Sequence, residues 1–101
     1  QKDQIELLEE LVREKFEVMI VGVFAYPLDE SYLGRMVDRG FIRDAVILRE
    51  KYGISPSGEG GEFESFVLKC PLFKKRLKVL SYEDYKEGEN SWRREVEVEA
   101  E

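Results

Sequence analysis

The sequence contains no histidine and only one cysteine, Cys70, in 101 residues. Without histidine the chain cannot form a Ser-His-Asp triad, and no imidazole is present to act as a general base. A single cysteine excludes an internal disulfide and the paired spacings typical of zinc sites, so we expect no metal site. Cys70 precedes Pro71 among apolar residues, which favours a small buried side chain over a reactive thiol.

Long apolar runs are also missing. No stretch approaches the roughly 20 residues of a membrane helix, and no signal-peptide pattern opens the sequence, so we expect a cytoplasmic protein without a membrane partner. The net charge of −6 argues against direct binding of nucleic acid. The 43% hydrophobic content indicates a globular chain, and its length suits one domain, residues 1–101.

The hydrophobic periodicity predicts an α+β fold. We expect a mixed sheet of about four strands, with helices before and between the first two strands and an antiparallel pair at the C-terminus. The predicted helices span residues 3–15, 30–37 and 41–52, and the predicted strands span residues 18–25, 63–68, 74–82 and 92–100. Residues 18–25 are apolar on both faces, which is typical of a central strand covered on both sides.

Three polar residues follow that central strand. Asp29 is a good N-cap for the helix predicted at residues 30–37. In sheets with crossover helices, ligands gather at the carboxyl ends of the strands. We therefore expect Asp29, Tyr32 and Arg35 to face a binding site. The alternatives are that Asp29 only caps the helix and that Arg35 only pairs with a nearby acid.

The most unusual stretch combines three glycines with three glutamates: Gly58, Glu59, Gly60, Gly61, Glu62 and Glu64. Consecutive glycines at the entry to a strand predict a positive φ angle or a close neighbour at Gly60 or Gly61. No lysine follows the glycines, and the acids would repel phosphate, so the loop favours a cation, ammonia or a neutral polar group. The alternative is a tight turn whose exposed glutamates, including Glu62, point into water.

A basic cluster follows this loop after Pro71. Lys74, Lys75, Arg76 and Lys78 lie close together in the sequence. Such charges usually protect an exposed strand from unwanted pairing. The alternative is a docking role against an acidic protein surface.

Several of these motifs resemble one family. The stretches are VGVFAY at residues 21–26, LDESYLGR at 28–35, GEGGEFES at 58–65 and CPLFKKR at 70–76. In order and spacing they are similar to the C-terminal half of the diphthine–ammonia ligase family, which are PP-loop ATP pyrophosphatases of the adenine nucleotide alpha-hydrolase type. Two departures stand out. Ser57 replaces a cysteine found in many members, and the SGGKDS nucleotide motif is absent from these 101 residues, so we expect this chain to correspond to the second half of a ligase without the N-terminal ATP-binding domain.

The resemblance implies an enzyme, an ATP-dependent carboxylate–ammonia ligase of diphthamide biosynthesis. In that family ATP activates a carboxylate as an acyl-adenylate, and ammonia then displaces AMP. The acceptor is diphthine on elongation factor 2. The resemblance implies catalytic roles for Glu59 and Glu62, which could deprotonate ammonium. Substrate-binding roles fall to Gly58, Gly60, Gly61, Phe63, Glu64, Asp29, Tyr32 and Arg35.

Carboxylates and aromatic rings are good partners for the trimethylammonium group of diphthine, so the loop glutamates could instead hold this cation. The rival functions are a binding module for a cationic or methylated ligand that works without ATP, and a PP-loop enzyme with another acceptor. Self-association into a homo-oligomer stays open at this stage.

Overall fold

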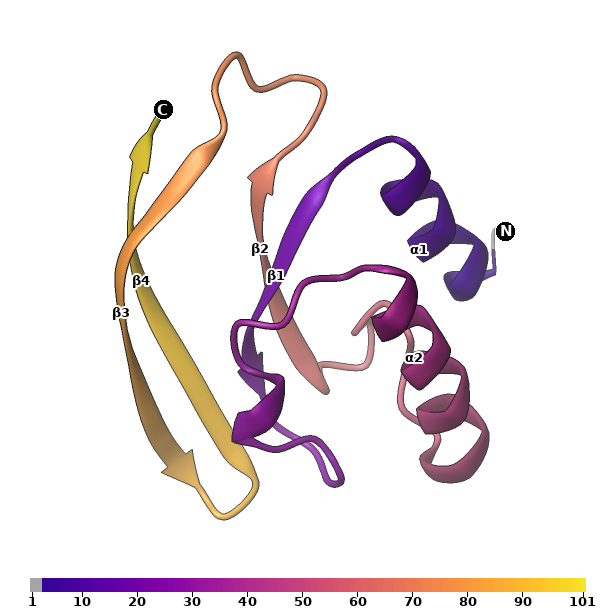
Figure 1. Ribbon diagram of the computed structural model, residues 1–101. Helices are drawn as coiled ribbons and strands as arrows, with labels where there is room; N and C mark the ends of the chain where they lie inside the picture. Colours follow the sequence, from indigo (N-terminus) through magenta and orange to yellow (C-terminus); the bar gives the residue numbers. More distant parts are fainter. Residues whose placement is uncertain (1–2) are drawn as a thin grey trace.

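The computed structural model describes residues 3–101 of the chain. Its elements, in order, are α1 (Gln4–Arg13), β1 (Glu17–Val23), the short 3₁₀ helix η1 (Glu30–Tyr32), α2 (Arg39–Tyr52), β2 (Phe63–Lys69), β3 (Leu77–Gly88) and β4 (Ser91–Ala100). Both helices lie on one side of β1 and β2, and the β3–β4 hairpin lies on the other (Figure 1). The α+β class is confirmed, with a helix before β1 and another between β1 and β2.

The four strands form one sheet in the order β2-β1-β4-β3. Every pairing is antiparallel, whereas the sequence suggested a mixed sheet. The reason lies at the turn into β2. The Phe24 N–H donates to the Glu62 carbonyl at 2.9 Å, so β2 starts beside the end of β1 and runs back along it. The end of β1 and the start of β2 therefore meet at the same end of the sheet.

The strand β1 separates two clusters of buried apolar side chains, which confirms the prediction that it is covered on both faces. One face packs against the helices through Val18, Ile20 and Val23. The other face packs against β2 and the hairpin through Met19 and Val21. Alternate residues of a strand point to opposite faces, and a register shift between Ile20 and Gly22 lets Val23 join Val18 and Ile20 on the helix side. An apolar residue at nearly every position therefore fills both clusters.

The prediction of a second helix at residues 30–37 is wrong beyond the first turn. Only Glu30–Tyr32 is helical, because Gly34 has a φ of +82° and turns the chain away. The following residues pair with β1. The Gly34 N–H donates to the Ile20 carbonyl at 2.8 Å, and the Val37 N–H donates to the Val18 carbonyl at 2.8 Å. This segment occupies an edge of β1 that β4, which pairs only with Gly22 and Val23, leaves open.

Local signals account for the two full helices. Asp3 caps α1 by accepting from the Ile5 N–H, and Asp38 caps α2 by accepting from the Phe41 N–H. α1 ends at Arg13, two residues earlier than predicted, and Lys15 takes a left-handed φ of 62° on the way into β1. α2 ends at Tyr52, and the following Gly53 has a φ of 71°, which confirms its expected role as a left-handed cap.

Candidate functional site

The glycine loop lies where β1 ends and β2 begins. Two turns close it, with the Gly58 N–H donating to the Ser55 carbonyl and the Gly61 N–H donating to the Gly58 carbonyl, both at 3.0 Å. Gly58 and Gly61 have φ angles of +75° and +81°, which confirms the predicted backbone at Gly61. A side chain at Gly58 would also press against Phe63, whose carbonyl lies 3.0 Å from the position of a Cβ atom. Glycine is therefore required here by conformation and by space.

The carboxylate of Glu62 closes the loop from inside. Its Oε2 accepts from the Ser55 N–H and from the Ser55 hydroxyl, each at 2.8 Å. Burial alone would raise the pKa of this carboxyl, but the bonds from Ser55 and from the backbone around Gly60 outweigh it, so the pKa of Glu62 is lowered. Glu62 is thus half-buried, ionised and engaged at pH 7, whereas the sequence suggested an exposed loop side chain.

Gly60 leaves room for that carboxylate. A Cβ atom at Gly60 would come within 2.7 Å of Glu62 Oε1. This same oxygen is buried and, among residues 3–101, has no hydrogen-bond partner. The Gly60 N–H donates to the Ser55 hydroxyl at 3.2 Å, so Ser55 connects both parts of the loop. The tight fit fixes the loop around the Glu62 carboxylate.

The other two loop glutamates lie in different surroundings. Glu64 pairs with Arg93 on β4 at 2.5 Å, and Arg93 also pairs with Glu87 at 2.8 Å. Glu64 and Arg93 are both register partners of Gly22 on β1, so their ion pair spans the central strand over a residue without a side chain. Glu59 is exposed and has no hydrogen bond or ion pair within residues 3–101. The three carboxylates therefore do not share one partner.

The predicted site residues that follow β1 also have different partners. Asp29 caps η1 by accepting from the Ser31 N–H at 3.0 Å, as the simpler alternative proposed. Arg35 pairs with Asp44 at 2.6 Å, and its guanidinium lies 5.6 Å from the centre of the Tyr32 ring. Burial, followed by the Asp44 charge, raises the pKa of Tyr32, so its hydroxyl is neutral at pH 7.

Aromatic contacts join this segment to the glycine loop. The Arg35 guanidinium also lies 5.5 Å from the centre of the Phe41 ring, and Phe41 meets Phe63 edge to face at 5.8 Å. The structure thus brings Tyr32, Arg35 and Phe63 together around Phe41, on the helix side of β1. Both Tyr32 and Phe63 pack against the hydrophobic core, so their rings support the site from its core side.

Sequence reasoning missed four residues of this region. Ser55 and Arg93 bind Glu62 and Glu64, and their separations of 7 and 29 residues give no local signal. Tyr26 and Tyr52 form an edge-to-face pair with ring centres 5.9 Å apart. They remain 69% and 50% exposed, so this pair offers free aromatic surface beside the end of β1. The aromatic residue just before Pro27 was the only available hint.

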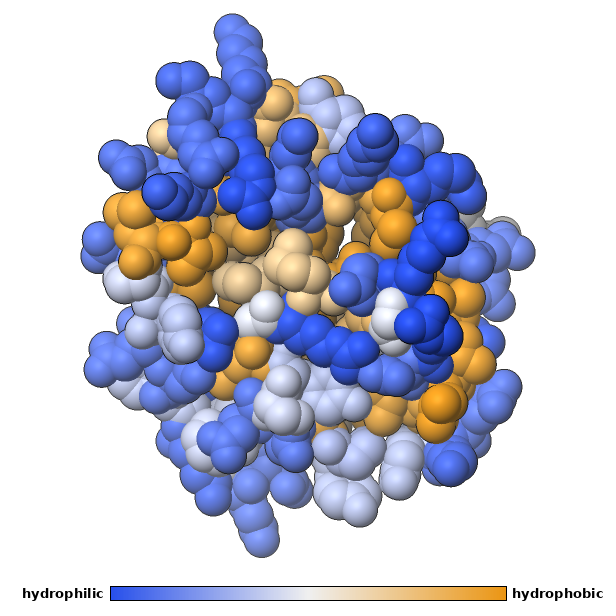
Figure 2. Space-filling view, in the orientation of Figure 1, coloured by the Kyte–Doolittle hydropathy of each residue, from blue (hydrophilic) through white to orange (hydrophobic). Residues whose placement is uncertain are grey.

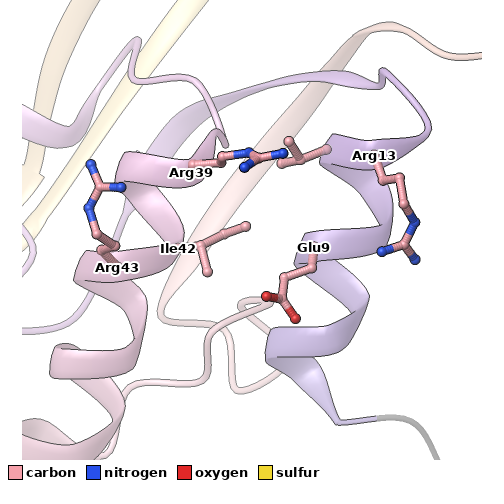
Figure 3. A pocket seen from close by; sticks show the side chains of 6 residues that line it. Glu9, Arg13, Arg39, Ile42 and Arg43 are labelled. Carbon is pink, nitrogen blue, oxygen red and sulfur yellow. The ribbon is translucent and has the colours of Figure 1, made fainter.

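Two hollows of the surface lie away from the glycine loop. One, of about 400 Å³, lies between α1 and α2 (Figure 3), and another, of about 440 Å³, lies on the β3–β4 hairpin. The glycine loop lines neither. Residues 3–101 contain no group of three or more acidic or cysteine side chains placed to hold a metal ion. Over the same residues, no helix is long and apolar enough to cross a membrane.

Fold and site together define an α+β domain with an acidic, internally braced glycine loop at the end of its central strand. A family model described as the diphthamide synthase C-terminal domain matches residues 3–98. The chain therefore belongs to this family, as the motif resemblance indicated.

Curated relatives agree with this assignment. The human protein named diphthine–ammonia ligase is 42% identical over 84 residues, which make up 82% of this chain and 31% of the human protein. A Schizosaccharomyces pombe protein of the same name is 40% identical over 78 residues, 76% of this chain and 12% of that protein. The chain thus spans less than a third of these relatives.

Proposed function

We propose that this chain is the acceptor-side part of an amide ligase that converts diphthine on elongation factor 2 to diphthamide, using ATP and ammonia. The observation that carries the proposal is the GEGGEFES loop, which hydrogen bonds between Glu62 and Ser55 hold closed, in a chain of this family. Glu62 holds the loop closed through Ser55, while Glu59 stays exposed at the same end of the sheet. A plain turn would not require a half-buried, ionised carboxylate that accepts two hydrogen bonds for its support.

The loop does not fit the triphosphate of ATP. Glu59 lies between the two turn-forming glycines, Gly58 and Gly61, and the Ser55 donors are already bound to Glu62. A phosphate would meet negative charge at Glu59 and Glu62. We therefore assign nucleotide binding to other parts of the enzyme, and the loop acts only on the acceptor and the amine.

In our proposal Glu59 acts on the amine partner. Ammonium must lose a proton before its nitrogen can attack an activated carboxylate, and an exposed carboxylate is a suitable acceptor. The same charge also suits the trimethylammonium group of diphthine. The exposed rings of Tyr26 and Tyr52 supply the aromatic faces that such a cation prefers, in place of the partly buried Tyr32 and Phe63.

A chimera tests this function. Residues 3–98 would replace the matching segment of the human ligase, and amidation of diphthine-bearing elongation factor 2 would be followed by mass spectrometry. We expect diphthamide to form at a rate within about tenfold of the human enzyme, because the replaced segment is of the same family. A chimera that folds by circular dichroism, binds ATP and yet forms no diphthamide would contradict the proposal.

A further inference from the structure

The groove between α1 and α2 combines positive charge with an apolar floor. Six residues line it, Glu9, Val12, Arg13, Arg39, Ile42 and Arg43. In Figure 3, Arg39 extends from the start of α2 toward α1, and Arg13 and Arg43 stand at the outer sides of the two helices. The row of three arginines thus spans both helices, although the chain as a whole carries a net charge of −6.

These arginines have no internal function that the contacts reveal. Within residues 3–101, Arg13, Arg39 and Arg43 form no ion pair, whereas five other arginines of the chain do. All three are exposed. Among the described residues that line the groove, Glu9 is the only acid beside three arginines, so positive charge remains in excess.

The positions of Arg39 and Arg43 are unfavourable for α2 itself. Arg39 is the first residue of the helix, and after the N-cap Asp38 no acidic residue lies in the first turn. The start of a helix carries partial positive charge, which favours acidic side chains there. Arg39 and Arg43 are also four positions apart, a spacing at which like charges repel. Such departures from the charge preferences of a helix are typical of surfaces that have a binding role.

We propose that this groove binds an acidic, partly apolar segment of a partner protein. The row of arginines is spread over two helices, which suits an extended chain of carboxylates better than a single phosphate ion. Arginine forks bind carboxylates through paired hydrogen bonds. Val12 and the buried Ile42 supply an apolar floor between them. The space-filling view likewise shows hydrophobic surface enclosed by hydrophilic side chains over the helices (Figure 2).

The test measures binding of a fluorescent peptide of repeated Glu-Glu-Leu triplets to the 101-residue chain by anisotropy at low salt. The variant Arg39→Gln/Arg43→Gln should weaken binding about fivefold to tenfold, the loss of two rim charges. The control Lys74→Gln/Lys75→Gln removes the same charge from the exposed β2–β3 loop and should change binding less than about twofold. Equal losses in both variants, or no binding by the parent chain, would overturn the proposal.

Two further measurements separate peptide binding from RNA binding and from an effect on folding. A single-stranded RNA oligonucleotide should bind more weakly than the peptide, and tighter RNA binding that is lost in Arg39→Gln/Arg43→Gln would overturn the choice of a protein partner. Thermal melts of the same variant report on folding. Because the two arginines repel each other and the start of α2, their replacement should leave the Tm unchanged or raise it. A Tm lowered by several degrees would show a structural role and overturn the proposal.

Discussion

In the glycine loop, Glu62 accepts two hydrogen bonds from Ser55, and Glu64 pairs with Arg93 across the central strand. In the groove between α1 and α2, Arg39 and Arg43 are exposed and have no ion pair within residues 3–101. Both regions concentrate charge of one sign. The loop neutralises most of its charge inside the chain, and the groove leaves its charge to the outside.

The difference separates two uses of a charged side chain. A carboxylate that accepts internal hydrogen bonds stabilises the backbone around it and contributes little to binding of a partner. An unpaired charge contributes little to folding and stays available for recognition. Glu59 resembles the groove arginines, because its charge is exposed and has no partner within residues 3–101. It nevertheless lies only three positions from Glu62 in the same motif.

The largest expected effect comes from removing the internal bonds of the loop. Glu62→Ala leaves the Ser55 N–H and hydroxyl without their acceptor, and should lower the free energy of unfolding by about 1–3 kcal/mol. Urea denaturation measures this loss. Glu59→Ala, the matched control, should leave the unfolding curve unchanged. If the two variants lose equal stability, Glu62 does not support the loop.

A smaller effect is expected at Gly60. Gly60→Ala places a methyl group within 2.7 Å of the Glu62 carboxylate and should lower stability by about 1 kcal/mol by displacing it. A double-mutant cycle tests this cause. In a Glu62→Ala background, Gly60→Ala should lose most of its effect.

Gly61→Ala is the control for that cycle. Its effect arises from the positive φ of +81°, and nothing lies within 4 Å of a Cβ atom there. It should therefore keep its full effect of about 1 kcal/mol when Glu62 is replaced. Additivity for Gly60→Ala as well would show that the fit between Gly60 and Glu62 is unimportant.

Lowering the pH should test the hydrogen bonds to Glu62 without a substitution. Since the pKa of Glu62 is lowered in the folded chain, its contribution to stability is fully present above the ordinary value of 4.5. That contribution is lost as the pH falls through the lower folded pKa. Unfolding midpoints measured from about pH 7 to about pH 3 should therefore fall more steeply for the parent chain than for Glu62→Gln. Parallel curves would show that the carboxylate is not stabilised by folding.

Most of the fold follows from local signals in the sequence. The apolar pattern of β1, the cap at Gly53 and the alternation of the hairpin each depend on neighbouring residues. The segment 30–37 was mispredicted because its helical signals end at Gly34, and pairing with β1 determines the path of the chain from Gly34 to Val37. The antiparallel sheet was missed because strand direction depends on where β2 returns beside β1.

The sequence predicted where the site lies in the chain but not which side chains contact one another there. The glycines and glutamates at residues 58–64 marked the loop, and Gly61 has the positive φ expected of it. The inward turn of Glu62 and the pairing of Glu64 depend on Ser55 and Arg93, which become neighbours only in the folded chain. Whether these residues act in catalysis stays a prediction.

The smallest effect on folding is expected at Glu59, and it carries the functional prediction. Glu59→Gln keeps the size of the side chain but removes an exposed charge that forms no ion pair within residues 3–101. In the chimera with the human ligase, we expect diphthamide formation to fall about tenfold or more, the lower range for a lost proton acceptor, with an unchanged thermal melt. Glu50→Gln, at an exposed glutamate on α2, is the matched control and should retain full activity.

If ammonium loses its proton to Glu59, raising the pH should partly restore the activity of Glu59→Gln, because free ammonia becomes more abundant. Rescue by pH would assign proton transfer, whereas a pH-independent loss would assign binding of the trimethylammonium cation. Full activity of Glu59→Gln would exclude both roles and leave the loop without a charged group for either.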